Sequence, residues 1–303
     1  MSWRDKIAAV LAGKIGGPTP GGIHVYHSSP HDFDRFENRL LTGEGANVYG
    51  AGTYLAENPR VSGQGGTYWN QFLDRMEGPD RVGGGRLRAL DFDRAKAIES
   101  AQRDVTDWRN KAVPADPAYA AKMLKMREDE LRLLESGAPV GPRTYEVNFK
   151  AKPEQLLDWD KPLKQQPQVL DTIRDRFVYP FKPEETGASV YTGFVSYPYG
   201  MPGTTRDRAK QIISDKLGEA GIPGIRYLDE GSRVPPPSPL AQALMNRAKQ
   251  ANPELEQFKP THNYVAFDPS KLDIMAKYGV VGGVPLGAGA MSGTIDPSTY
   301  GSQ

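Results

Sequence analysis

Alternation of apolar and polar residues predicts several short β-strands. The clearest run, residues 23–27, follows a glycine-rich segment, and residues 145–149 show the same period of two. Shorter apolar runs predict further strands at 225–228 and 264–267, and a short strand or the start of a helix at 53–56. Outside its middle part, the chain therefore predicts mostly β-structure.

A spacing of three and four residues between apolar positions predicts helices in the middle of the chain. One helix face is formed by Ile98, Ala101, Val105 and Trp108. A second helix has Asp116 as a capping residue and Gly137 at its end. Together they predict a helical hairpin within residues 77–142 that serves packing or partner binding rather than catalysis. A further helix is predicted at 206–220.

These patterns divide the chain into three parts. Residues 1–22 predict a short amphipathic helix and a linker, and residues 23–275 predict one α+β domain that contains the hairpin. Residues 276–303 are glycine-rich and nearly uncharged, a composition that cannot bury enough apolar surface to fold alone. We expect this last part to be a flexible tail.

Composition narrows the classes of partner and compartment. The 303 residues include 38 Lys and Arg against 37 Asp and Glu, so the net charge gives no argument for nucleic acid or an anionic membrane as a partner. No cysteine is present, which excludes disulfides and thiolate chemistry and fits a reducing compartment. No apolar run approaches the roughly 20 residues of a transmembrane helix, and the start lacks the apolar stretch of a signal peptide. We expect a cytoplasmic protein without a transmembrane segment.

Common catalytic motifs are absent from the sequence. His27 and His31 are four residues apart, but Pro30 argues against a helix that would bring them together, and no carboxylate cluster completes a metal site. The sequence has no Gly-x-Ser-x-Gly elbow, no Gly-x-Gly-x-x-Gly after a strand and no Gly-Lys-Ser/Thr. A metal site, a serine hydrolase, a Rossmann fingerprint and a P-loop are therefore not predicted. We expect Arg226 to pair with a carboxylate inside the fold, and Asp229 to lie in a solvated loop.

Five short motifs occur in an informative order along the chain. They are YHSSPHDFDRF, TGEGANVYGAGTYLAENP, YEVNFKAKPEQLLDWDKPL, GIPGIRYLDEGSR and HNYVAFD. Together they span about residues 23–268 and resemble the His-Tyr-Glu class of ADP-ribosyltransferases, which includes diphtheria-type toxins and poly(ADP-ribose) polymerases. They look closer still to the ADP-ribosyltransferase-like domains of phage and prophage proteins, often very large polyvalent ones. The resemblance implies a split pair of small, mostly antiparallel sheets around an NAD cleft, with the hairpin as an insertion.

The resemblance also implies NAD-binding roles for residues of the first two motifs. His27 would hydrogen-bond the adenosine-side ribose, and the backbone of Ser28 would clamp the nicotinamide carboxamide where the family usually has Gly. Tyr54 would form one wall of the nicotinamide pocket, with Gly50 and Gly52 allowing close approach of the backbone. Spacing adds further candidates, which are Tyr68 or Trp69 for the second aromatic wall and Ser62 for a carboxamide contact.

The third catalytic position departs from the family pattern. The family's glutamate, which would support the oxocarbenium-like transition state, is replaced by Asn263 at the start of the last motif's strand. An amide keeps the hydrogen bonding and loses the charge, and the loss of one such contact costs ~2.7–4 kcal/mol. Three interpretations stay open: a slow or altered transferase, a pocket that binds NAD without chemistry, or a glutamate supplied elsewhere. Glu57 and Glu44 are the candidates for that carboxylate.

The implied function is transfer of ADP-ribose from NAD to a protein or other acceptor, with release of nicotinamide and without a metal. Such a protein would be a phage-encoded effector that acts on a host protein in the bacterial cytoplasm, with packaging in the virion as one route. The alternative is a virion or ejected protein that keeps the fold for structure or for NAD binding, in contact with other particle components. The uncharged C-terminal tail and the inserted hairpin suit an assembly component.

Overall fold

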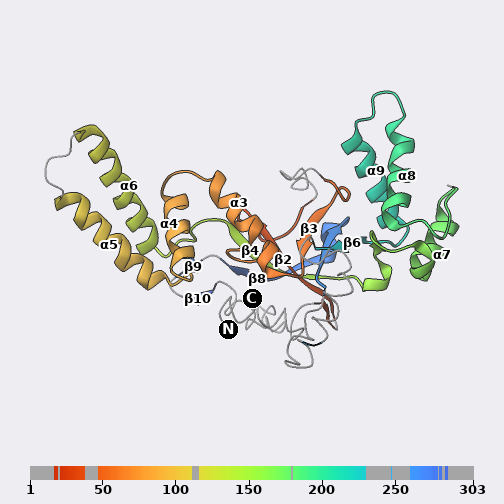
Figure 1. Ribbon diagram of the computed structural model, residues 1–303, viewed down its shortest axis with the longest axis horizontal. Helices are drawn as coiled ribbons and strands as arrows, with labels where there is room; N and C mark the ends of the chain where they lie inside the picture. Colours follow the sequence, from red (N-terminus) through yellow and green to blue (C-terminus); the bar gives the residue numbers. More distant parts are fainter. Residues whose placement is uncertain are drawn as a thin grey trace, which may run out of the picture. The chain divides into compact units, whose positions relative to one another are not determined.

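The protein is described here as a computed structural model (Figure 1). The structure describes residues 17–19, 21–37, 47–110, 116–178, 180–229, 247, 260–278, 280–281 and 284–285. The chain forms two compact units. The first unit consists of Met1–His27, Phe33–Thr67 and Glu146–Ile274, and the second unit consists of Ser28–Asp32, Tyr68–Tyr145 and Met275–Gln303. Each unit has a cluster of buried apolar side chains of its own.

One mixed sheet contains most of the described strands. These are β1 (Gly17–Thr19), β2 (Gly22–Ser29), β3 (Thr53–Ala56), β4 (Arg143–Phe149), β5 (Leu157–Asp158), β6 (Gly224–Leu228), β7 (His262–Ala266) and β8 (Leu272–Tyr278). The strand order is β5-β6-β7-β3-β2-β4-β8, with β1 paired to β2. Strand β5 runs parallel to β6, while β6–β7, β7–β3 and β3–β2 are antiparallel pairs. Two short strands, β9 (Val280–Val281) and β10 (Val284–Pro285), form a separate pair.

The predicted α+β class is confirmed, but the arrangement of the strands differs from the expectation. The strands of the order above are joined in one sheet, whereas the resemblance implied a split pair of sheets. The prediction of a mostly β chain outside its middle part was wrong. Helices α7 (Pro167–Arg176) and α8 (Gly187–Tyr199) interrupt it in addition to the predicted helix α9 (Arg206–Glu219).

Register across the sheet determines which side chains share a face. Tyr54 lies opposite Val265, and Val265 lies opposite Ile225, so these three side chains point to the same side. Leu55 and Tyr264 form the next row, and they point to the other side because side chains alternate along a strand. The first face contributes Val265 and Ile225 to the core of the first unit, against which Tyr54 packs.

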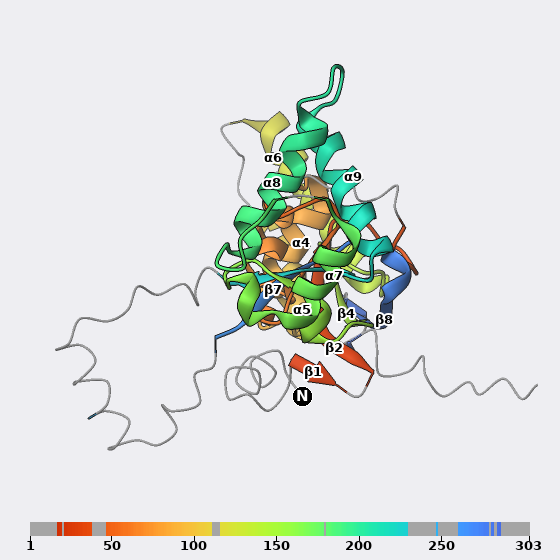
Figure 2. The same cartoon turned by 90° about the vertical axis from the view of Figure 1, so that its right-hand side faces the viewer.

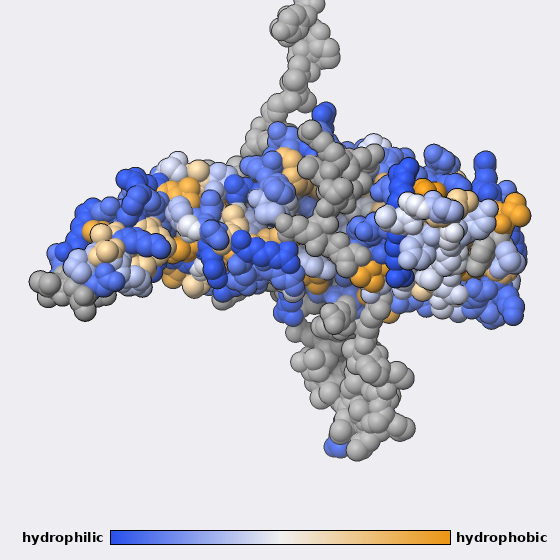
Figure 3. Space-filling model, turned by 90° about the horizontal axis from the view of Figure 1, so that it is seen from above, coloured by the Kyte–Doolittle hydropathy of each residue, from blue (hydrophilic) through white to orange (hydrophobic). Residues whose placement is uncertain are grey.

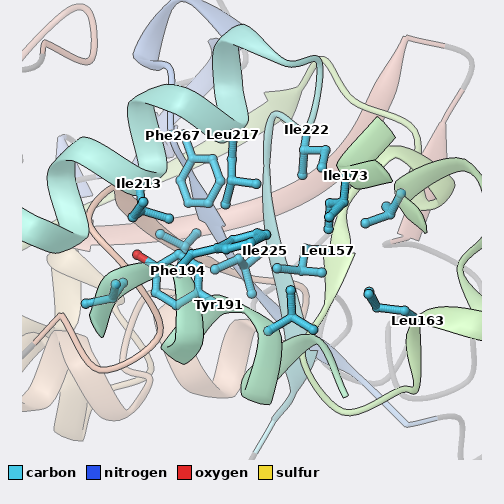
Figure 4. Close-up of a cluster of buried hydrophobic side chains, with 14 of the residues drawn as sticks. Leu157, Leu163, Ile173, Tyr191, Phe194, Ile213, Leu217, Ile222, Ile225 and Phe267 are labelled. Atoms are coloured by element: carbon cyan, nitrogen blue, oxygen red, sulfur yellow. The ribbon is translucent and has the colours of Figure 1, made fainter. Parts of the chain in front are cut away.

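Helices α7, α8 and α9 supply most of the other side chains of this core, and α8 and α9 lie side by side (Figures 1 and 2). Figure 4 shows Phe194, Ile213 and Leu217 from the helices together with strand residues Leu157 and Ile225. Burial of each such side chain contributes about 1.5–3 kcal/mol. This apolar cluster therefore holds the helices on the β5–β6–β7 part of the sheet.

The local sequence explains why α9 forms a helix, but it does not explain α8. The hydroxyl of Thr205 accepts a hydrogen bond from the backbone N–H of Arg208 at 3.2 Å, which caps α9. Helix α8, with the sequence GASVYTGFVSYPY, contains glycines, β-branched residues and Pro198. These residues have low helix propensity, and burial of its apolar face outweighs that preference.

The second unit contains four helices in its described part. They are α3 (Thr67–Arg75), which begins one residue before the unit, α4 (Gly78–Ala89), α5 (Arg94–Asn110) and α6 (Pro117–Glu135). The predicted hairpin corresponds to α5 and α6, and the carboxylate of Asp116 accepts hydrogen bonds from the N–H groups of Ala118 and Tyr119. Helix α4 was not predicted because it contains three consecutive glycines.

Close packing explains the glycines of α4. A Cβ on Gly84 would come within 2.6 Å of a methyl group of Leu73, and a Cβ on Gly83 within 2.9 Å of Val140. Glycine usually weakens a helix by about 1 kcal/mol, but here it allows the helix to approach its neighbours.

Parts of the predicted domain boundaries lie outside the described residues. The amphipathic helix expected at the start of the chain falls largely on residues 1–16, and the expected tail falls largely on residues 286–303. Residues 17–19 form β1 and pair with β2. In the described part of the chain, no helix has the length and apolar character needed to cross a membrane. The described residues visible in Figure 3 are mainly hydrophilic, with smaller hydrophobic areas among them.

Two buried arginines connect the helices of the second unit. The guanidinium of Arg94 donates to the carbonyls of Leu133, Leu134 and Ala138 at 2.6–2.9 Å, so it closes the C-terminal end of α6. The guanidinium of Arg86 donates to both carboxylate oxygens of Glu130 at 2.6 and 3.1 Å. Glu130 is fully buried, so this ion pair links α4 to α6 away from solvent.

Replacement of Glu130 should strongly destabilise the protein. In Glu130→Ala, the mostly buried guanidinium of Arg86 loses its main carboxylate partner, and breaking a buried ion pair in this way costs about 3–5 kcal/mol. Urea denaturation followed by circular dichroism measures this loss. Asp129→Ala, on the same helix, removes a half-buried carboxylate that pairs with the exposed side chains of Lys125 and Arg132 and serves as the control. Equal stability of the two variants would contradict a structural role for the buried pair.

Candidate functional site

Three residues singled out from the sequence lie on three neighbouring strands of the first unit. His27 is in β2, Tyr54 is in β3 and Asn263 is in β7, and β3 lies between the other two strands. These residues are far apart in the sequence, and the strand order brings their strands together. The site is therefore built around β3, with the side chains of Tyr54 and Asn263 on one face of the sheet and that of His27, which follows Tyr26 opposite Ala56, on the other.

His27 is joined to β3 by its side chain. Its Nδ1 lies 2.9 Å from the backbone carbonyl oxygen of Tyr54, and since a carbonyl only accepts, Nδ1 carries the proton. The ring also makes an edge-on contact with Phe36, at a centroid distance of 5.3 Å. Burial lowers the pKa of His27, although the bond to Tyr54 raises it in part. The neutral imidazole therefore dominates near neutral pH, with Nε2 as a hydrogen-bond acceptor.

Tyr54 uses its hydroxyl group to close the loop that precedes β3. The hydroxyl donates to the carbonyl of Gly50 at 2.9 Å and accepts from the N–H of Tyr49 at 3.1 Å. The Tyr49 ring in turn stacks on Tyr227, with centroids 3.8 Å apart and planes within 10° of each other. Since the Tyr54 ring packs against the first unit's core, its position depends on both the core and the loop.

The glycines beside Tyr54 are required by the protein's own packing. A Cβ on Gly52 would overlap the carbonyl oxygen of Ala266 in β7. Gly50 has a φ of 125°, a conformation that other residues rarely adopt, and a Cβ there would lie 3.0 Å from the hydroxyl of Tyr191. The sequence suggested that Gly50 and Gly52 make room for a cofactor, and this contact with protein accounts for both without one.

Asn263 is buried and has an unused acceptor. It lies opposite Ala56 on β3 and opposite Tyr227 on β6, and 7% of its surface is exposed. Its Oδ1 has no hydrogen-bond partner among the described residues. A buried polar atom without a partner costs about 1–3 kcal/mol. Such an atom is a candidate contact for a bound molecule with a donor group.

Glu57 lies on the opposite face of the sheet from Asn263. Its carboxylate accepts hydrogen bonds from the backbone N–H of His262, at 2.9 Å, and from the hydroxyl of Tyr264. These two residues flank Asn263 in β7, and side chains alternate along a strand, so Glu57 and Asn263 point to opposite sides. Burial alone would raise the pKa of Glu57, but the hydrogen bonds from His262 and Tyr264 together lower it. Glu57 is therefore an anion that joins β3 to β7.

Neither Glu57 nor Glu44 is placed beside Asn263 in the described part of the chain. Glu57 is held by two partners on the other face, so it does not share the face of Asn263. Glu44, the second candidate, lies outside the described residues. In the described part, the register thus gives Asn263 the neighbours Ala56 and Tyr227, neither of which carries a charge.

The remaining candidates divide between the two units. Ser62 belongs to the first unit and is buried in the short helix α2 (Pro59–Ser62), which Asn58 caps. Ser28 is buried and Tyr68 is 39% exposed, and both belong to the second unit. Trp69 is also in the second unit, where its indole N–H donates to the carbonyl of Pro142 at 2.7 Å. Trp69 thus has a packing role in the second unit.

Two further polar groups of the first unit, Arg226 and Asp229, make hydrogen bonds inside the fold. Arg226 pairs with Asp158, with Nη2 at 2.8 Å from Oδ2, as predicted for a carboxylate inside the fold. The prediction for Asp229 was wrong, because this residue is buried and accepts hydrogen bonds from Thr261 at 2.8 Å and Asn58 at 3.4 Å. The local sequence does not indicate that Asp229 is buried, because its hydrogen-bond partners come from two distant segments.

In the described ranges, no group of three or more His, Asp or Glu side chains is arranged to hold a metal ion. No family model, curated protein or solved structure matches the chain. The candidate site is therefore interpreted from its geometry and from the sequence motifs.

Glu57→Gln should destabilise the protein at neutral pH. The amide that replaces one carboxylate oxygen cannot accept from His262 or Tyr264 at that atom, a loss of about 1–3 kcal/mol. The folded-state pKa of Glu57 is lowered, so its contribution is present above the unfolded-state pKa and is lost as the pH falls through the folded-state value.

Urea denaturation at about pH 7 and about pH 3 measures both effects, because a glutamate titrates between these values. The difference between the variant and the wild type should be large at the higher pH and smaller at the lower pH. Glu99→Gln, at an exposed position of α5, is the matched control and should change neither value. A pH-independent difference for Glu57→Gln would show that the charge of Glu57 is unimportant.

Proposed function

We propose that the protein binds NAD at the site around β3 and transfers its ADP-ribose group to an acceptor at a low intrinsic rate. The observation that carries the proposal is the placement of His27, Tyr54 and Asn263 on adjacent strands. This adjacency supports the proposal because the resemblance to His-Tyr-Glu ADP-ribosyltransferases assigns all three positions to one NAD site. The motifs alone fix the order of the three residues in sequence and say nothing of their proximity.

The state of His27 supports a role in binding ribose. Its Nδ1 proton is used by the carbonyl of Tyr54, so in the neutral ring Nε2 is an acceptor atom. In the proposed complex a ribose hydroxyl donates to this atom. The imidazole is fixed by the bond to β3 and by contact with Phe36, which lowers the entropy cost of binding.

The reaction that we propose is a substitution at the anomeric carbon of the nicotinamide ribose. The bond between this carbon and the pyridinium nitrogen breaks, and nicotinamide leaves as a neutral molecule with the bonding electron pair. An acceptor nucleophile forms the new bond to the same carbon and releases its proton to solvent. The transition state has positive charge on the ribose, which a nearby carboxylate would stabilise.

Asn263 supports a slow form of this reaction. Its Oδ1 can accept a hydrogen bond from the nucleotide, and it brings no negative charge to the developing cation. Glu57 is held on the other face of the sheet by His262 and Tyr264, so it does not replace that charge. We therefore infer that binding of NAD is retained more fully than turnover.

A binding experiment tests the first part of the proposal. Isothermal titration of the full chain with NAD should give a measurable Kd, and His27→Ala should weaken it roughly fivefold to tenfold through loss of one hydrogen bond. His31→Ala removes an exposed histidine four residues away and should leave the Kd unchanged. Failure of the wild type to bind NAD would refute the proposed function.

Restoration of the missing charge tests the second part. Asn263→Glu should increase nicotinamide release from NAD by about a hundredfold, since one preorganised electrostatic contact contributes a factor of about 10²–10³. Asn263→Gln has nearly the same shape without the charge and should not increase the rate. Chromatographic measurement of nicotinamide, with unfolding curves for both variants, separates rate from stability. An equal rate in the Glu and Gln variants would argue against the proposed chemistry.

The second candidate function is NAD binding without catalysis in a structural protein of a phage particle. The two residues directly opposite Asn263, Ala56 and Tyr227, favour it because neither carries a charge, and the buried carboxylate of Asp229 on the same face is engaged by Thr261 and Asn58. Under this alternative, NAD binds while nicotinamide release stays at the background rate in the wild type and in Asn263→Glu. Mass spectrometry of purified particles would reveal a virion component, and label transfer from NAD to host proteins would instead identify an effector acting in the bacterial cytoplasm.

A further inference from the structure

Lys210 of helix α9 contacts the loop that leads into β3. Its ammonium group donates to the backbone carbonyl of Asn47 at 2.5 Å, across a sequence separation of 163 residues. Only 8% of the Lys210 surface is exposed, and burial lowers the pKa of its side chain. A buried ammonium is costly unless it is hydrogen-bonded, so this contact contributes to the stability of the loop conformation.

The carbonyl of Asn47 belongs to a hydrogen-bonded turn that fixes the position of the Tyr54 side chain. The N–H of Gly50 also donates to the carbonyl of Asn47, at 3.2 Å, and the carbonyl of Gly50 accepts from the hydroxyl of Tyr54. Asn47 has a φ of 43°, in the left-handed region that is unfavourable for most residues other than glycine. A chain of hydrogen bonds therefore runs from Lys210 through this turn to Tyr54.

Helix α8 holds the same loop at a second point. The buried hydroxyl of Tyr191 donates to the backbone carbonyl of Lys210 at 3.4 Å and lies 3.3 Å from the hydroxyl of Ser214 in α9. It also occupies the space next to Gly50, where a Cβ would lie 3.0 Å away. The α8–α9 pair thus fixes residues 47–52 through one charged group and one neutral group.

We propose that Lys210 is a positioning residue for the candidate NAD site. Its ammonium group fixes residues 47–52, and this loop fixes the ring of Tyr54 through the bonds to Tyr49 and Gly50. Lys210 does not touch the nucleotide in this proposal. The inference rests on the proposed function, because it assigns a consequence for NAD binding to a contact within the protein.

The test combines hydrogen exchange of the loop amides with NAD titration. In Lys210→Met, which keeps the aliphatic stem and removes the charge, the amides of residues 49–51 should exchange at least about tenfold faster, since a hydrogen bond to a charged group corresponds to a factor of ten or more. The Kd for NAD should rise by about the same factor. Lys210→Arg retains a charged donor and should recover most of both values. Lys216→Met, at an exposed position of the same helix, is the control.

Each outcome decides one part of the proposal. Unchanged exchange in Lys210→Met would overturn it, and so would faster exchange with an unchanged Kd. Unfolding curves of all variants show whether a general loss of stability, equal in α9 and in the loop, explains the exchange, which would also overturn it. If the wild type binds no NAD, the proposed function fails, and local exchange then decides whether Lys210 fixes the loop.

Discussion

The pairing of the four-residue strand β3 with its two neighbours is the interaction on which the first unit depends. β3 is short, yet it lies between β2 and β7. It therefore joins two strands that are more than 200 residues apart in the sequence. Backbone hydrogen bonds alone would hold so short a strand weakly. Side chains therefore extend the pairing at both ends, with His27 bonded to the Tyr54 carbonyl on one side and Glu57 bonded to His262 and Tyr264 on the other.

The elements that could be predicted from the sequence are those with a strong local pattern. Strands β2 and β4 contain alternating positions, β7 contains a short apolar run, and α6 has a capping Asp116 and an apolar face. Helix α4 could not be predicted, because its glycines are explained only by the close approach of Leu73 and Val140, which are distant in the sequence. Tertiary packing decided this element against its local propensity.

The sequence predicted which residues belong to the candidate site, but it did not predict how their side chains are arranged. The motifs placed His27, Tyr54 and Asn263 in order, but the face on which each side chain lies depends on strand register, which a single sequence does not contain. For this reason Glu57 was a reasonable candidate for the missing carboxylate until its partners were known. Likewise, the contact of Lys210 with Asn47 joins two segments that are 163 residues apart, and neither sequence indicates that they meet.

Because of Arg94, the two ends of the helical hairpin in the second unit should differ in how strongly salt weakens their electrostatic interactions. At the buried end of α6, its charge is balanced by backbone carbonyls at the negative end of a helix dipole, where mobile ions have little access. Towards the other end, exposed pairs such as Arg109–Glu128, with charges 2.7 Å apart, are weakened when concentrated salt shortens the Debye length to about 3 Å. Concentrated salt would thus fray the hairpin from its tip, while its attachment to the rest of the unit stays intact.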